Sequence, residues 1–147
     1  MGRKVFLIHG RNHGTRDTVA RFLEKLQIKV VIMMEQPNQG RTLIEKLEGN
    51  ADTDFAIALL TPDDEGGLKG GVQKARSRQN VILELGYFMG RLGRNRVCAL
   101  VQGDVEIPTD YYGVVYIDFD DSNAWQQQLI GELKAARFSI DANRAFT

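Results

Sequence analysis

Short apolar runs alternate with segments of helical periodicity along the whole chain, and this alternation restricts the possible folds most strongly. Five runs read as strands: 4–9, 30–34, 55–60, 97–101 and 113–117. Four segments read as helices: 16–26, 42–47, 81–92 and 125–136. Continuous apolar strands separated by helices are typical of a parallel sheet with both faces covered. We therefore predict an α/β protein with a flavodoxin-like three-layer fold and a five-stranded parallel sheet.

Chain length and composition indicate one globular domain. The 147 residues are the size of a single domain, and no internal repeat, low-complexity tract or linker divides residues 1–147. No apolar stretch approaches the length that spans a bilayer, so we expect no membrane partner. The lone cysteine, Cys98, falls in an apolar run, which is typical of a reduced core residue in a cytoplasmic protein.

Charge and metal-ligand content argue against two classes of function. Nineteen Lys and Arg residues balance nineteen Asp and Glu residues, so the chain offers no basic field to a nucleic-acid backbone. The two histidines, His9 and His13, lie in one loop, and a zinc site would need more ligands than these. We therefore predict no nucleic-acid partner and no metal site.

Ligands of a doubly wound sheet bind outside the carboxyl ends of its strands, which selects three loops: 9–15, 35–41 and 61–78. The first loop opens with four candidate residues: His9, Gly10, Arg11 and Asn12. Glycine permits close backbone approach there, and the start of the following helix offers free N–H groups to a phosphate. Both the dinucleotide fingerprint and the Walker A ending are missing, so an ordinary strand-to-helix turn explains this loop equally well.

The third selected loop is a long polar segment with four glycines that begins with Thr61, Asp63 and Asp64. Adjacent carboxylates suit ribose hydroxyls or a metal, whereas the tripeptide Pro-Asp-Asp also favours a solvated turn. A phospho-receiver would need its acceptor aspartate at the end of the preceding strand. Leu60 and Thr61 stand at that place, which argues against a receiver.

Glu84 is the one carboxylate inside the apolar stretch "QNVILELGYF", residues 79–88. Because this helix is apolar nearly all round, we expect it to be buried, and a buried acid must be paired, neutralised or directed into a cavity. Two interpretations stay open on the residues alone. Glu84 forms a structural ion pair with Arg78 or Arg91, or it is a functional acid at the rim of a nucleotide-sized cleft.

Five segments carry a resemblance to a known family: "KVFLIHGRN", "EQPNQGRTLIEKLE", "DFAIALLTPDDEG", "RQNVILELGYFMGRLG" and "VEIPTDYYGVVYIDFD". Together they resemble the bacterial TIR-like, predicted nucleotide-binding family, which includes effector domains of cyclic-nucleotide-triggered antiphage systems. The resemblance extends over nearly the whole chain, and "RQNVILELG" and "LLTPDD" are its most specific parts. It implies a flavodoxin-like domain that cleaves NAD+ as its substrate, without a cofactor, and that answers to a cyclic-nucleotide sensor.

The resemblance also implies roles for particular residues. Glu84 matches the catalytic acid on the helix after the third strand, and residues 35–41 match the loop that flanks the active site and takes part in self-association. Asn80 stands where animal and plant relatives often carry a tryptophan. The candidate substrate-binding residues lie on the selected loops and at the start of the Glu84 helix: His9, Gly10, Arg11, Asn12, Arg41, Thr61, Asp63, Asp64, Arg78 and Asn80.

A single acid is compatible with this chemistry. Ordinary glycosidases need two carboxylates, one of which protonates the leaving group. The nicotinamide of NAD+ is a cationic pyridinium and departs neutral without a proton, so one anion that stabilises the ribose oxocarbenium charge is enough. We predict an NAD+ glycohydrolase that forms nicotinamide and linear or cyclic ADP-ribose. The alternatives are a non-catalytic nucleotide-binding or TIR interaction module and an enzyme similar to nucleoside deoxyribosyltransferases.

Overall fold

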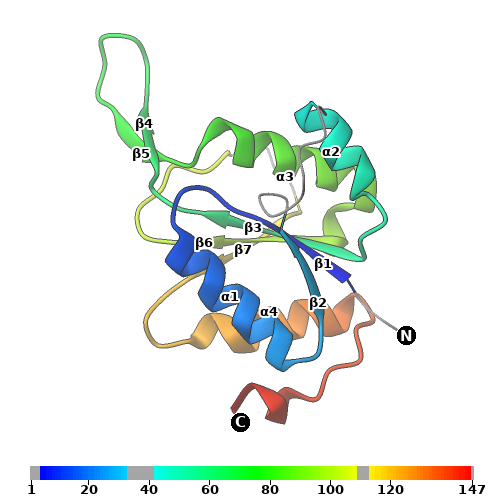
Figure 1. Cartoon of the computed structure of the whole chain (residues 1–147). Helices are drawn as coiled ribbons and strands as arrows, with labels where there is room; N and C mark the ends of the chain where they lie inside the picture. The colour runs from blue at the N-terminus through cyan, green and yellow to red at the C-terminus, as the bar shows by residue number, and fades with distance from the viewer. Residues whose placement is uncertain (1–3, 33–41, 109–112, 147) are drawn as a thin grey trace.

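The computed structural model describes residues 4–32, 42–108 and 113–146 (Figure 1). Its main sheet has five parallel strands in the order β2-β1-β3-β6-β7. Their bounds are Lys4–Ile8 (β1), Lys29–Ile32 (β2), Phe55–Leu60 (β3), Val97–Val101 (β6) and Val115–Asp118 (β7). The predicted fold class is confirmed. The order of the strands reverses between β1 and β3, so the ligand crevice of this fold lies at their carboxyl ends.

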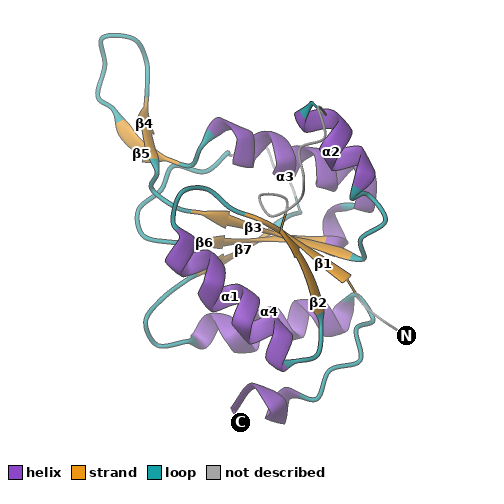
Figure 2. Ribbon diagram, in the orientation of Figure 1, coloured by secondary structure: helices purple, strands orange, loops and turns teal. Residues whose placement is uncertain are grey.

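Helices cover both faces of the sheet (Figure 2). The four α-helices are His13–Lys25 (α1), Leu43–Gly49 (α2), Gln79–Leu92 (α3) and Ala124–Ala135 (α4). Two short 3₁₀ helices, Arg94–Arg96 (η2) and Ala142–Phe146 (η3), complete the described helices. Figure 2 shows α1 and α4 on one side of the sheet and α2 and α3 on the other. No helix in the described ranges is both long and apolar enough to cross a membrane.

Side-chain alternation along the strands creates two hydrophobic clusters, one on each face of the sheet. Val5 and Leu7 of β1 belong to the cluster under α1 and α4, whereas Phe6 and Ile8 belong to the cluster under α3. From Val5 onward β1 is therefore apolar at every position, as β3 is along its whole length, which explains why both strands read as continuous runs.

Local capping sets the start of α1, which periodicity alone placed too late, and it also marks the start of α2. The predicted first helix began at Arg16, but α1 begins at His13 because the Asn12 side chain accepts a hydrogen bond from the Thr15 amide at 3.1 Å. Thr42 and Glu45 form a reciprocal capping box at the start of α2. Caps depend on one or two polar side chains, so an apolar pattern does not report them.

The predicted polar loop 61–78 was wrong in one respect, because it contains an antiparallel hairpin. Its strands are Asp64–Gly66 (β4) and Lys74–Arg76 (β5), and the hairpin projects from the body of the domain (Figure 1). At its base, Glu106 N donates a hydrogen bond to Ala75 O at 2.9 Å. Two three-residue polar strands show no hydrophobic alternation, so sequence patterning does not detect them.

The predicted all-round burial of the Glu84 helix was also wrong. α3 buries one stripe, formed by Val81, Glu84, Leu85 and Phe88, while Leu83 is 47% exposed. These buried positions follow the i, i+3, i+4, i+7 spacing of an amphipathic helix. Glu84 thus occupies a core-facing position in the first half of α3, where an apolar residue would be the ordinary choice.

Candidate functional site

The loops after β1 and β3 are joined at the crevice by Asp63. One oxygen of its carboxylate, Oδ2, accepts hydrogen bonds from Thr61 Oγ1 at 2.7 Å and from the Arg11 amide at 3.2 Å. Gly10 lies so close that a Cβ at this position would collide with the same carboxylate. Three predicted site residues, Gly10, Thr61 and Asp63, therefore shape the junction between the loops.

Asn12 also holds the loops in place. In addition to capping α1, its Nδ2 donates to Gln102 Oε1 at 3.1 Å, and the Thr15 hydroxyl donates to the same oxygen at 3.1 Å. The Gln102 amide donates to Leu60 O at 3.0 Å. Gln102 therefore links the ends of β1, β3 and β6. Sequence reasoning missed it, and its only signal was a polar residue directly after a buried strand.

His9 is a half-buried neutral imidazole beside this junction. Its Nδ1 lies 2.9 Å from Gly10 O, so the neutral ring donates from Nδ1 and leaves Nε2 as an acceptor. Burial lowers the pKa of His9, and the charges of Arg16, His13 and Arg78 act in the same direction. The hydrogen bond to Gly10 O raises this pKa and opposes part of the effect.

Glu84 is the strongest electrostatic anomaly at the crevice. It is 9% exposed, and burial raises the pKa of its carboxyl from 4.5 to about 7, against the opposing charge of Arg78. Within the described ranges, its carboxylate makes no hydrogen bond and no ion pair, so the alternative of a structural ion pair with Arg78 or Arg91 does not hold. The influence of Arg78 on both Glu84 and His9 indicates that this guanidinium lies near each of them.

A polar cavity of about 370 Å³ opens beside the start of α3. Four predicted site residues line it: Arg11, Asp64, Arg78 and Asn80. The hairpin and the residues next to it supply the rest of the lining, which the sequence did not predict: Glu65, Gly66, Gly67, Gln73, Arg76, Ser77 and Gln79. Glu84 does not line this cavity, and Arg41 lies outside the described residues.

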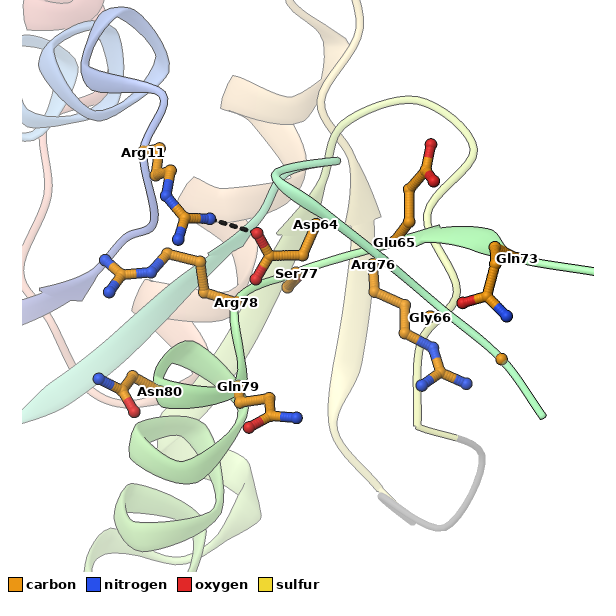
Figure 3. A pocket seen from close by; sticks show the side chains of 11 residues that line it. Arg11, Asp64, Glu65, Gly66, Gln73, Arg76, Ser77, Arg78, Gln79 and Asn80 are labelled. Atoms are coloured by element: carbon orange, nitrogen blue, oxygen red, sulfur yellow. Dashed lines mark hydrogen bonds and ion pairs between the residues drawn. The ribbon is translucent and has the colours of Figure 1, made fainter. Parts of the chain in front are cut away.

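Ion pairing leaves one arginine of this cavity available. Arg11 reaches from the β1–α1 turn to pair with Asp64 (Figure 3), and Arg76 pairs with Glu106. Arg78 forms no ion pair with any residue that the structure describes. It also precedes α3 without providing a side-chain cap, so the first-turn amides of α3 lack one. A free guanidinium beside an uncapped helix start is suited to a phosphate group.

Metal ligands do not cluster in the described part of the chain, where no group of three or more His, Cys, Asp and Glu side chains is placed to hold an ion. Besides arginines and backbone amides, the crevice offers the buried Glu84 carboxylate, the bonded carboxylates of Asp63 and Asp64, and the neutral His9 imidazole.

Comparison with known proteins shows the family of the chain. The family model for the TIR domain of CAP12/Pycsar effector proteins matches residues 4–121. YuaY, an uncharacterized protein of Escherichia coli strain K12, is 42% identical over all of this chain and 50% of its own length. The Pycsar effector protein PaPycTIR of Pseudomonas aeruginosa is 44% identical over 52% of this chain and 25% of its own length. The chain thus spans about half of YuaY and a quarter of PaPycTIR.

Two solved structures share the fold. The TIR domain of the Toll-related receptor TRR-2 from Hydra magnipapillata superposes with a TM-score of 0.66 and 13% identity, over 91% of this chain and 98% of that chain. The CMP N-glycosidase BcmB from Clostridium botulinum superposes with a TM-score of 0.52 and 16% identity, over 87% of this chain and 98% of that chain. At such identities the likeness concerns the fold. The match of the family model over most of the sequence carries the assignment, and the chain belongs to the TIR-domain family of CAP12/Pycsar effector proteins.

Proposed function

We propose that this TIR domain hydrolyses the bond between nicotinamide and ribose in NAD+. The observation that carries the proposal is Glu84, a core-facing carboxylate with a pKa of about 7 and no bonded partner in the described ranges. A buried, unpaired carboxylate lowers the stability of the fold. Its place beside a cavity suited to phosphate is therefore typical of a functional group. NAD+ is the substrate in this proposal, and no further cofactor takes part.

Glu84 acts in its anionic form. As the C1′–N bond breaks, its electron pair stays on the pyridinium nitrogen, so nicotinamide leaves as a neutral molecule. The ribose then carries a positive charge, which the Glu84 carboxylate stabilises in surroundings where few waters screen it. A water molecule, or a ring nitrogen of the adenine in the cyclising variant, attacks C1′. In hydrolysis, the proton lost by that water passes to Glu84 or to solvent.

The remaining predicted residues hold the substrate or shape its site. Arg78 binds the pyrophosphate, together with the α3 amides and Asn80 at the helix start. Arg11 and Asp64 border the same cavity, while Gly10, Asn12, Thr61 and Asp63 fix the turns around it. The neutral His9 offers Nε2 as an acceptor for a ribose hydroxyl.

Self-association of the domain and a sensor control the activity. Relatives named Pycsar effector proteins, together with the resemblance described above, support an antiphage effector that depletes cytoplasmic NAD+ after a cyclic-nucleotide signal. The sensor lies on the same chain or on a partner. The loop 35–41, with Arg41, completes the site when copies of the domain associate.

The test is nicotinamide release by the domain, free and fused to an oligomeric scaffold, from NAD+. Glu84→Gln keeps the size of the side chain and removes the charge, so we expect a loss of activity of at least about 100-fold. Glu24→Gln, which changes an exposed acid on α1, is the matched control and should retain wild-type activity. Wild-type turnover by Glu84→Gln would refute the catalytic role. No release by the clustered wild-type domain would favour a non-catalytic interaction module.

A second N-glycosidase activity is the alternative that the Glu84 pKa supports. Cytosine or another neutral base needs a proton to leave, and a carboxyl with a pKa near 7 is partly protonated at neutral pH. BcmB, a CMP N-glycosidase, shares this fold. The pH profile separates the two reactions. Cleavage of NAD+ should rise as pH increases through about 7, because the anion is the active form, whereas protonation-dependent release from CMP or a deoxynucleoside should fall.

A further inference from the structure

A second cavity of about 270 Å³ adjoins the polar one. Its lining differs in character, because Ile82, Ile107 and Pro108 give it apolar surfaces. It shares three residues with the polar cavity: Arg76, Ser77 and Gln79. The two cavities therefore meet along the segment that joins the hairpin to α3.

Ser77 stands at this junction with an unused hydroxyl. Its side chain is 6% exposed, and Oγ has no hydrogen-bond partner among the described residues. A buried hydroxyl without a partner is unfavourable, so such groups usually form a hydrogen bond. A ligand that enters from the shared boundary would supply that partner.

The arginine on the same boundary is already neutralised. Arg76 Nε donates to Glu106 Oε1 at 2.9 Å, and both residues line the apolar cavity. The apolar cavity therefore has a closed ion pair at its rim and carries no net charge. A cavity of this kind suits an uncharged planar ring better than a phosphate. The neighbouring polar cavity, with its free Arg78, suits the phosphate.

The α3 helix arranges these environments in a definite order. At about 100° per residue, Ile82 lies about 60° from Gln79 in one direction around the helix axis, and Asn80 and Glu84 lie about 100° and 140° from it in the other. Figure 3 shows Gln79 and Asn80 pointing to opposite sides of the start of α3. Around the helix one therefore meets an apolar cavity, then an arginine-lined cavity, and then the Glu84 carboxylate.

We propose that the apolar cavity lined by Ile82, Ile107 and Pro108 is a base subsite, which binds the adenine of the dinucleotide. This inference rests on the proposed function and deepens it. The order of environments around α3 matches the order of groups in NAD+, namely a neutral base, a pyrophosphate and the ribose that carries the scissile bond. The apolar side chains contact the faces of the ring, and the Ser77 hydroxyl bonds to its polar edge.

The experiment compares NAD+ with nicotinamide mononucleotide, which contains the same scissile bond but no adenylate. Ile107→Trp fills the apolar cavity and should lower the ratio of kcat/KM for NAD+ to kcat/KM for the mononucleotide by about tenfold. Ser77→Ala removes one hydrogen bond without adding volume and should lower the same ratio about threefold to tenfold. Leu83→Trp, on the exposed side of α3, is the control for a bulky substitution and should leave the ratio unchanged.

Binding of AMP gives a second readout that does not depend on turnover. AMP should shift the methyl resonances of Ile82 and Ile107 in the wild-type protein and bind Ser77→Ala about threefold to tenfold more weakly. A wild-type protein that cleaves NAD+ while both variants keep its substrate ratio would overturn the base subsite and leave the proposed function standing. A wild-type protein that releases no nicotinamide, yet binds AMP at these two isoleucines, would overturn the function and leave the subsite standing. Absence of AMP shifts at both residues would overturn the subsite in either case.

Discussion

Replacing Glu84 by glutamine should stabilise the domain above neutral pH while removing its activity. Burial holds the pKa of this carboxyl at about 7 in the folded protein, against 4.5 for the free group. At about 1.4 kcal/mol per pKa unit, the ionised side chain is disfavoured in the folded state by roughly 3 kcal/mol. Glutamine has nearly the same volume and no charge to desolvate, so it escapes this penalty.

The sign of the pH dependence follows from the raised pKa. The folded state keeps the Glu84 proton between pH 4.5 and about 7, whereas the unfolded chain releases it, so wild-type stability decreases as pH rises through this window. Glu84→Gln should match the wild type near pH 4 and exceed it by up to roughly 3 kcal/mol at pH 8. For a domain of this size the difference corresponds to a rise in Tm of roughly 6–12 °C.

Denaturant titrations at pH 5, 6, 7, 8 and 9 measure this difference directly. The control is Glu24→Gln, because that acid is exposed on α1 and its replacement should leave the curve of stability against pH unchanged. A stability difference between Glu84→Gln and the wild type that stays constant from pH 5 to pH 9 would refute the reasoning. That result would mean that Glu84 ionises in the folded protein as easily as in water.

Three further predictions follow from the same structure. Gly10→Ala should lower the free energy of unfolding by about 1–3 kcal/mol, because its Cβ meets the Asp63 carboxylate. Gly131→Ala, which has open space around it on α4, should raise the free energy of unfolding by up to about 1 kcal/mol. Thermal unfolding measures both changes. Arg78→Ala should raise KM for NAD+ more than Arg41→Ala, since Arg78 directly precedes α3, and equal steady-state constants for the two variants would contradict this. Nicotinamide release per molecule should increase with protein concentration, and a flat profile that includes a clustered fusion would show that each subunit holds a complete site.

The central strands were predictable because they are apolar at every position. Phe55–Leu60 and Val97–Val101 lie inside the sheet with both faces covered, so the predicted bounds and the observed bounds coincide. The bounds of edge strands were harder to predict. The last strand was predicted at 113–117, but β7 is Val115–Asp118 and ends on a polar residue. A strand that is buried on both faces has an apolar residue at every position, whereas a strand at the edge of the sheet mixes apolar and polar residues.

The candidate site was predictable as a location and less so as a set of contacts. The position of loops at the carboxyl ends of β1 and β3 brought Arg11, Asp64, Arg78 and Asn80 to one cavity. Ser77 was missed because a serine becomes notable only when its surroundings leave the hydroxyl unbonded. Whether a side chain finds a hydrogen-bond partner depends on segments that are distant in sequence, and a local sequence pattern does not reveal this.

The projecting hairpin contributes to the walls of the cavities without contributing to the hydrophobic core. Residues of β4 border the polar cavity and Arg76 of β5 borders both cavities, yet no residue of 64–76 belongs to either hydrophobic cluster. Its tip carries Leu68 and Val72, which are 85% and 83% exposed. Insertions, deletions or exchanges in this hairpin can therefore remodel the borders of the site while the sheet and its covering helices stay intact. In this chain, the hairpin is a segment in which substitutions can change the lining of the cavities at little risk to folding.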